Sequence, residues 1–270
     1  MVSDILSHNL YYISYLDLKQ NPLGNEGIKI LARGIMDSNS LVHLDLRSTA
    51  FRKEGADSLF KALEENETVN CLQIGNLKGL HKNMLSGKAI SGIESYLKKT
   101  MVLTFLDLKN AGIGNEGLNY LLKGLKVCNS LKYLDLSLNR LEATACPLIL
   151  DLLLKVRLKR LDLSQNLLGN SFLPLFSQHV KDTRFLITQL SLSSCGFSSI
   201  NLGFLFDALK GGVSLEHLAI DDIRYDQDSS EKLAQFISTD SVLKSISIGN
   251  CMLGDIGKVF AVTTRNKGSI

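Results

Sequence analysis

An eleven-residue pattern of the form LxxLxLxxNxL, in which x is any residue, recurs nine times along this chain. Its copies begin at residues 13, 41, 69, 103, 131, 158, 187, 215 and 243. Successive copies start 27 to 29 residues apart, except that the third and fourth are 34 apart. A pattern kept in register over nine copies indicates a stack of equivalent structural units.

Each unit combines two hydrophobic periods. The alternating LDL-type segment has period two and predicts a short strand with its leucines on one face. About a dozen residues later, apolar residues follow helical spacing. The clearest helical stripes are Ile28–Leu31–Ala32–Ile35, Ala56–Leu59–Phe60–Leu63, Leu118–Leu121–Leu122–Leu125 and Leu202–Leu205–Phe206–Leu209. The junction GNEG, at Gly24–Gly27 and Gly114–Gly117, offers an Asn that we expect to cap the helix of its own repeat.

One strand–helix unit cannot bury its leucines alone, so neighbouring units must stack. Helices are about 10 Å across and parallel strands about 4.8 Å apart, so the stack should bend toward its strands. We therefore predict an α/β fold: a right-handed solenoid, or horseshoe, of about nine leucine-rich repeats. Its parallel sheet would be concave and its helices convex, in a single domain over residues 1–270.

The composition agrees with this interpretation. Leucine supplies 51 of the 270 residues, and there is no tryptophan, so aliphatic side chains must build the core. The net charge of +3 is too small to indicate nucleic acid or an anionic membrane as a partner. Five cysteines without a CxxC pair favour neither a disulfide framework nor a zinc site. The N-terminus does not look like a signal peptide, and we expect a cytoplasmic protein.

Across about residues 10–265, these motifs resemble the ribonuclease-inhibitor-like class of leucine-rich repeats. The resemblance implies a horseshoe fold and a concave surface that binds proteins. It also implies that an Asn at position nine of each repeat bonds the backbone of the turn. Asn occupies that position at Asn21, Asn139 and Asn166, and Thr49, Cys195 and Cys251 have side chains that can replace it. Leu77, Ala111 and Ile223 cannot, so we expect looser or differently shaped turns there.

Neither end of the chain shows a polar capping unit. We therefore expect the terminal leucines to be partly exposed, and the ends to pack on another chain or on a segment that this sequence lacks. In the second case the sequence would be a fragment of a longer protein; the sequence leaves both alternatives open.

Strand residues between the core leucines should point into the concavity. Position three carries aromatic, His or Arg residues in most of the first six repeats, and position five carries Asp. Large amphipathic side chains of this kind are favoured interface anchors. The predicted partner-binding residues are Tyr15, Asp17, His43, Asp45, Phe105, Asp107, Tyr133, Asp135, Arg160 and Asp162. Lys19, Arg47 and Lys109 are placed to offset the repulsion between the acids. An equally weighted interpretation is that each Asp only makes local bonds.

The long spacing between repeats three and four marks a basic insertion near the strand-to-helix loop. It predicts a secondary basic rim at Lys78, His81, Lys82 and Lys88. The alternative is a surface loop without a binding role, which costs little free energy.

We expect no enzyme activity, cofactor or metal. Among the histidines, only His43 has a cysteine, Cys71, in the same column of the adjacent strand, and an open sheet offers this pair no oxyanion hole. The leading hypothesis is a non-catalytic module that binds a protein partner. The alternatives are a GTPase regulator similar to the Ran GTPase-activating protein, a structural subunit of a cytoskeletal or ciliary assembly, or a bacterial effector that mimics host repeats. The basic residues Arg265 and Lys267 at the end of the chain argue against the first alternative, whose members often end in an acidic tail.

Overall fold

The computed structural model describes residues 2–8, 12–79, 81–180, 186–210, 214–239 and 242–251. Its contacts divide the chain into two compact units, Met1–Leu141 with Lys155–Leu158, and Glu142–Leu154 with Lys159–Ile270. Each unit is described by itself, and the single domain over residues 1–270 stays a prediction. The tail that contains Arg265 and Lys267 lies outside the described residues.

Each repeat contributes one parallel strand of three residues, at positions three to five of the pattern. The strands are β1 (Tyr15–Asp17), β2 (His43–Asp45), β3 (Cys71–Gln73), β4 (Phe105–Asp107), β5 (Tyr133–Asp135), β6 (Arg160–Asp162), β7 (Gln189–Ser191), β8 (His217–Ala219) and β9 (Ser245–Ser247). Within each unit they pair in chain order, and equivalent positions lie opposite each other, as Tyr15 does to His43 and Arg160 to Gln189.

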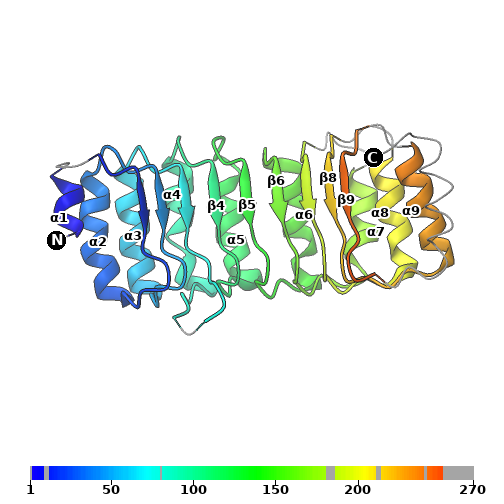
Figure 1. Ribbon diagram of the computed structural model, residues 1–270, viewed down its shortest axis with the longest axis horizontal. Helices are drawn as coiled ribbons and strands as arrows, with labels where there is room; N and C mark the ends of the chain where they lie inside the picture. Colours follow the sequence, from blue (N-terminus) through cyan, green and yellow to red (C-terminus); the bar gives the residue numbers. More distant parts are fainter. Residues whose placement is uncertain are drawn as a thin grey trace. The chain divides into compact units, whose positions relative to one another are not determined.

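The helices alternate with the strands and lie behind them in the view of Figure 1. The α-helices are α1 (Val2–Ser7), α2 (Gly24–Asp37), α3 (Lys53–Glu65), α4 (Ile93–Lys99), α5 (Gly114–Leu125), α6 (Cys146–Lys155), α7 (Phe172–Val180), α8 (Ser199–Leu209) and α9 (Gln227–Thr239). Two short 3-10 helices are η1 (Gly87–Ile90) and η2 (Ala143–Ala145). Alternating parallel strands and helices confirm the predicted α/β solenoid.

The core lies between the strands and the helices. All four predicted helical stripes are buried, and so are the position-four leucines of β2 to β8. Each buried leucine contributes about 1.5–3 kcal/mol through removal of apolar surface from water. At the chain ends, Ile13 and Leu16 in the first repeat and Leu243 and Ile246 in the ninth are only half-buried, as predicted.

The turn after each strand has the same backbone shape almost throughout. At position eight, eight of the nine repeats place a non-glycine residue at positive φ, between 52° and 63°. Asn110 and Asp222, which precede Ala111 and Ile223, share this conformation. The prediction of differently shaped turns in those two repeats is therefore wrong.

The reason is that the turns at Ala111 and Ile223 are bonded by the position-nine side chain of the following repeat. Asn139 Nδ2 donates to Leu108 O at 2.8 Å, and its Oδ1 accepts from Ile113 N at 3.1 Å. Cys251 Sγ likewise lies 3.5 Å from Ile220 O, one repeat back. A repeat that lacks a polar residue at position nine is thus completed by the next repeat.

Asn25 also acts between repeats. It lies inside the first turn of α2, whose N-cap residue, Leu23, makes no side-chain capping bond. Its Oδ1 instead accepts from Arg52 N at 2.8 Å and Gly55 N at 3.3 Å, at the start of α3. The prediction that Asn25 caps its own helix is wrong, because its side-chain oxygen accepts from N–H groups at the start of the next helix.

Candidate functional site

In the first unit, two exposed tyrosines each pair with a half-buried ring on the strand face that points away from the helices. Tyr15 and His43, on β1 and β2, have ring centroids 4.4 Å apart. Phe105 and Tyr133, on β4 and β5, have centroids 6.2 Å apart. Tyr15 is 56% exposed and Tyr133 38%, so both rings are available to a partner. We call these four residues the aromatic face.

Cys71 on β3 separates the two pairs. Its Sγ lies 3.9 Å from His43 Nε2, which also lies 3.1 Å from Gln73 Oε1. Burial, with the nearby charges of Asp45 and Asp107, raises the pKa of the Cys71 thiol to about 11. An activated nucleophile needs the opposite shift, so the predicted Cys–His proximity is present without the electrostatics of a catalytic thiolate.

The position-five aspartates bond locally. In each of the five repeats that carry Asp there, its Oδ1 accepts the backbone N–H of position seven. The distances are 3.0 Å for Asp17–Lys19, 3.0 Å for Asp45–Arg47, 2.8 Å for Asp107–Lys109, 2.8 Å for Asp135–Ser137 and 2.9 Å for Asp162–Ser164. Asp45 is fully buried and Asp107 is 5% exposed. This geometry supports the interpretation in which the aspartates fix the strand ends.

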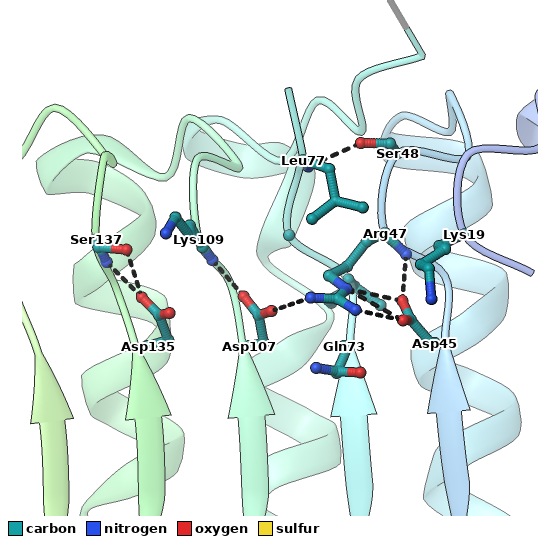
Figure 2. A network of polar contacts seen from close by, with 12 residues as sticks. Lys19, Asp45, Arg47, Ser48, Gln73, Leu77, Asp107, Lys109, Asp135 and Ser137 are labelled. Carbon is teal, nitrogen blue, oxygen red and sulfur yellow. Dashed lines mark hydrogen bonds and ion pairs between the residues drawn. The ribbon is translucent and has the colours of Figure 1, made fainter. Parts of the chain in front are cut away.

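Arg47 links β2 to β4 across β3 (Figure 2). Its guanidinium forms an ion pair with Asp45 at 2.6 Å and reaches Asp107 at 3.6 Å. Between these acids lies Gln73 of β3, which carries no charge. Gly75 occupies position seven of the repeat that contains Gln73. A Cβ on Gly75 would lie 2.5 Å from Lys109 O, so glycine lets the backbones of these two repeats approach closely. Lys19 pairs with Asp17 at 2.5 Å.

The carboxylate of Asp107 lies in a buried site that disfavours its charged form. Burial raises its pKa to about 6, and the charges of Asp135 and Asp45 act in the same direction. The Lys109 N–H and the Arg47 charge act in the opposite direction without offsetting the burial. The pKa of the more exposed Asp17 is instead lowered, chiefly by its hydrogen bond with Lys19.

The insertion lies in the predicted strand-to-helix region between β3 and η1, but the position-nine residue of the third repeat differs from the predicted one. Leu77 does not occupy position nine of the third repeat; Asn83 does, so the six extra residues are Leu77–Lys82. Asn83 Oδ1 accepts from Thr49 N at 3.0 Å, and Nδ2 donates to Leu46 O at 2.8 Å and Ile74 O at 3.0 Å. The motif Asn83–Met84–Leu85 repeats the NxL of the pattern and was the signal that could have revealed this.

Hydrogen bonds at both ends hold the insertion. Asn76 Oδ1 accepts from Asn83 N at 2.7 Å, and Asn76 Nδ2 donates to Asn83 O at 2.8 Å, which closes the loop. Leu77 N donates to Ser48 Oγ at 2.9 Å, as Figure 2 shows, and Ala50 N donates to His81 O at 3.2 Å. The predicted rim residues Lys78, His81, Lys82 and Lys88 are all exposed. Lys98 and Lys99 instead pair with Glu94 and Glu64.

In the second unit, Arg160 lies at one side of a hollow of about 510 Å³ on the strand face. Sequence reasoning missed this hollow because it weighed only large side chains. The space exists because position five carries the small residues Ser191, Ala219 and Ser247 in the last three repeats. Asp162 bonds Ser164 through both the backbone N–H and the hydroxyl.

No helix among the described residues has the length and apolar character to cross a bilayer.

Comparison with known proteins agrees with the repeat architecture. A family model described as Leucine Rich repeat matches residues 12–32, 37–60, 101–122 and 127–145. Human "NACHT, LRR and PYD domains-containing protein 14" is 26% identical over 216 residues, which cover 77% of this chain and 19% of that protein. The mouse "NACHT, LRR and PYD domains-containing protein 3" is 27% identical over 229 residues, covering 82% of this chain and 22% of that protein. "Rho GTPase-activating protein gacW" of Dictyostelium discoideum is 28% identical over 51% of this chain and 12% of that protein.

The chain therefore spans less than a quarter of the length of these curated relatives. Among solved structures, the leucine-rich repeat-containing protein LegL7 from Legionella pneumophila aligns over 100% of this chain and 95% of that chain. The sequence identity is 16% and the TM-score 0.49. Membership of the ribonuclease-inhibitor-like class stays a prediction. The recurring pattern, the alternating strands and helices and the matches to repeat proteins together show that this chain is built of leucine-rich repeats.

Proposed function

We propose that this protein is a non-catalytic interaction module that binds a partner protein through the aromatic face of its first unit. The observation that carries the proposal is the two aromatic pairs, Tyr15 with His43 and Phe105 with Tyr133. Large rings held on a rigid surface lose little conformational entropy on binding, so they suit an interface. Relatives built from the same repeats support an interaction role in general terms.

The charged residues at the carboxyl ends of β2 and β4 have a positioning role in this proposal. Asp45, Arg47 and Asp107 join β2 and β4 across β3, between the two aromatic pairs. A partner would then meet the rings and the partly exposed Arg47 rather than the buried carboxylates. Arg160 of the second unit is a further contact in the proposal, and Asp162 serves mainly to fix its own strand end.

Affinity purification from the native source, followed by mass spectrometry, tests this function. The wild-type chain is compared with a Tyr15→Ala/Phe105→Ala/Tyr133→Ala variant. The matched control is Ile30→Ala/Met101→Ala/Val127→Ala, which truncates three exposed apolar side chains outside the strands. The proposal expects a partner that the wild type and the control retain and the face variant loses. Equal retention by all three folded proteins would contradict it.

A second candidate function is regulation of a GTPase, which the similarity to "Rho GTPase-activating protein gacW" favours. The similarity covers 12% of that protein, so the chain would act as one part of such a regulator. A GTP-hydrolysis assay with Rho- and Ran-type GTPases distinguishes the two candidates. Acceleration by the isolated chain would support this second function and contradict a purely binding role.

A further inference from the structure

A cleft of about 220 Å³ lies in the first unit, between the insertion and the loops that follow β4 and β5. Lys82, Met84 and Ser86 line it from one side, and Asn110, Leu138 and Arg140 from the other. Figure 1 shows the insertion as a cyan loop that projects beyond the carboxyl ends of the neighbouring strands. The cleft lies at the edge of the sheet, and its lining shares no residue with the aromatic face.

The charge of this cleft has one sign. Lys82 and Arg140 are exposed, and no carboxylate is among the described residues that line the cleft. Neither cation forms an ion pair with another described residue, whereas Lys98, Lys99 and Arg47 all pair with acids. Two unpaired cations facing one small space favour an anionic occupant, because its carboxylate would gain charge-assisted hydrogen bonds there.

The other lining groups suit a peptide. Asn110 and Ser86 add neutral hydrogen-bonding groups, and Met84, 49% exposed, and the half-buried Leu138 add an apolar wall. The volume is below the roughly 300–1,000 Å³ typical of sites that enclose a whole small molecule. It has room for one or two side chains of an extended segment, with an acidic group beside an apolar one.

The walls of the cleft are held in place. Leu85 N donates to Ala111 O at 3.0 Å, and Asn76 Nδ2 donates to Asn110 O at 2.8 Å, so the insertion is bonded directly to the loop after β4. Asn76, which also closes the insertion, is 3% exposed. A cleft with fixed walls loses less entropy on binding than a flexible loop would.

We propose that this cleft binds an acidic segment of a partner protein, with a carboxylate between Lys82 and Arg140 and a neighbouring apolar side chain against Met84 and Leu138. The site is separate from the aromatic face and does not depend on it. A partner that meets both surfaces would bind with the added effective concentration of a two-site contact.

The test uses fluorescence anisotropy with the full chain and a fluorescein-labelled peptide in which two Asp-Glu pairs flank one leucine. The proposal expects saturable binding of this peptide and none of its Asn-Gln counterpart. Lys82→Ala/Arg140→Ala should weaken the binding roughly tenfold, as expected from the loss of two ion pairs at an exposed site. The control Lys61→Ala/Arg33→Ala removes the same charges from exposed positions on α3 and α2 and should change it less than twofold.

Three results would overturn the proposal. The first is no binding of the acidic peptide, and the second is an equal loss in the cleft and control variants, which would indicate diffuse attraction alone. The third is displacement of the peptide by an equal concentration of inorganic phosphate, which would indicate a simple anion site. Circular dichroism of each variant confirms folding. The Tyr15→Ala/Phe105→Ala/Tyr133→Ala variant should bind the peptide like the wild type, so the two surfaces are tested separately.

Discussion

The guanidinium of Arg47 contacts the carboxylates of Asp45, 2.6 Å away in its own repeat, and Asp107, 3.6 Å away on β4. A single cation therefore serves two buried acids on either side of a strand that has no charge at the same position. Arg47 is therefore a counter-ion shared by two buried carboxylates of the strand face.

Replacement of Arg47 by Met should destabilise the protein strongly. It leaves Asp45, whose side chain is fully buried, without its counter-ion, and such a change costs about 2–4 kcal/mol. Urea unfolding followed by circular dichroism measures the effect. Lys19→Met is the matched control, because the Lys19–Asp17 pair is exposed and should contribute less than about 1 kcal/mol. Equal unfolding midpoints for the two variants would contradict this role of Arg47.

Replacement of Asn83 by Ala should also be costly. Its side chain is buried and bonds backbone groups of both the second and the third repeat, so the change leaves several of these groups without partners. We expect a loss of about 2–4 kcal/mol in the free energy of unfolding. Asn21→Ala, at the equivalent but exposed position of the first repeat, should cost less than half as much. A larger effect at Asn21 would show that Asn83 is not the position-nine residue.

Deletion of Leu77–Lys82 should leave a folded protein. The deletion joins Asn76 to Asn83 and restores the usual 28-residue spacing between repeats. Far-ultraviolet circular dichroism and a cooperative unfolding transition check this expectation. The variant also lacks Lys82, so it should bind the acidic peptide more weakly than the wild type. A deletion variant that does not fold would show that the insertion is part of the core.

The contribution of Asp107 to stability should fall as the pH rises. An acid in an ordinary ion pair shows the opposite dependence, because its contribution falls as the pH falls. Its pKa is raised to about 6 in the folded protein, so between about pH 4 and pH 6 the folded state binds the extra proton. The contribution of Asp107 to stability is therefore present at pH 4 and lost as the pH rises through 6. Asp107→Asn removes this dependence, and relative to wild type it should gain at most about 2–3 kcal/mol between pH 4 and pH 7.

Urea unfolding of both proteins at the two pH values measures the Asp107 effect. Asp17→Asn is the control of opposite sign, because the pKa of Asp17 is lowered and its contribution is lost as the pH falls. A pH-independent difference between Asp107→Asn and wild type would contradict the raised pKa.

Cys71 should react slowly with iodoacetamide at neutral pH. With a pKa of about 11, roughly one thiol in ten thousand is ionised at pH 7. Peptide mapping after timed alkylation measures the rate, and an unfolded sample in urea gives the reference for an ordinary thiol. Faster alkylation of Cys71 in the folded protein than in urea would revive the hypothesis of a catalytic Cys–His pair.

The periodic part of this structure could be predicted from the sequence. The strand register and the buried stripes follow directly from the spacing of leucines, because each unit can bury them in only one way. The side chains that act between units could not be predicted by local rules. Asn25 looks like a cap for its own helix and caps the next one, and Leu77 takes the ninth place only if the count ignores the loop closed by Asn76.

The candidate site was harder to predict than the fold, because exposure depends on neighbours. Asp17 and Asp45 occupy the same position of their repeats, yet only Asp45 has a strand on both sides and is fully buried. The cleft beside Lys82 depends on three loops that the linear pattern treats as unrelated. The hollow on the second unit exists because small residues line it. A sequence analysis that looks for large interface residues does not predict such a space.

Asn76 and Asn83 bond each other at the two ends of the insertion. The inserted residues are therefore separate from the residues that form the framework of the repeat. The junction between positions eight and nine accepts extra chain while the framework on either side keeps its bonds. Foreign recognition loops of chosen length and composition could be grafted at this point, much as hypervariable loops are exchanged on an antibody framework. The third repeat would then serve as a display site on a scaffold whose remaining repeats stay unchanged.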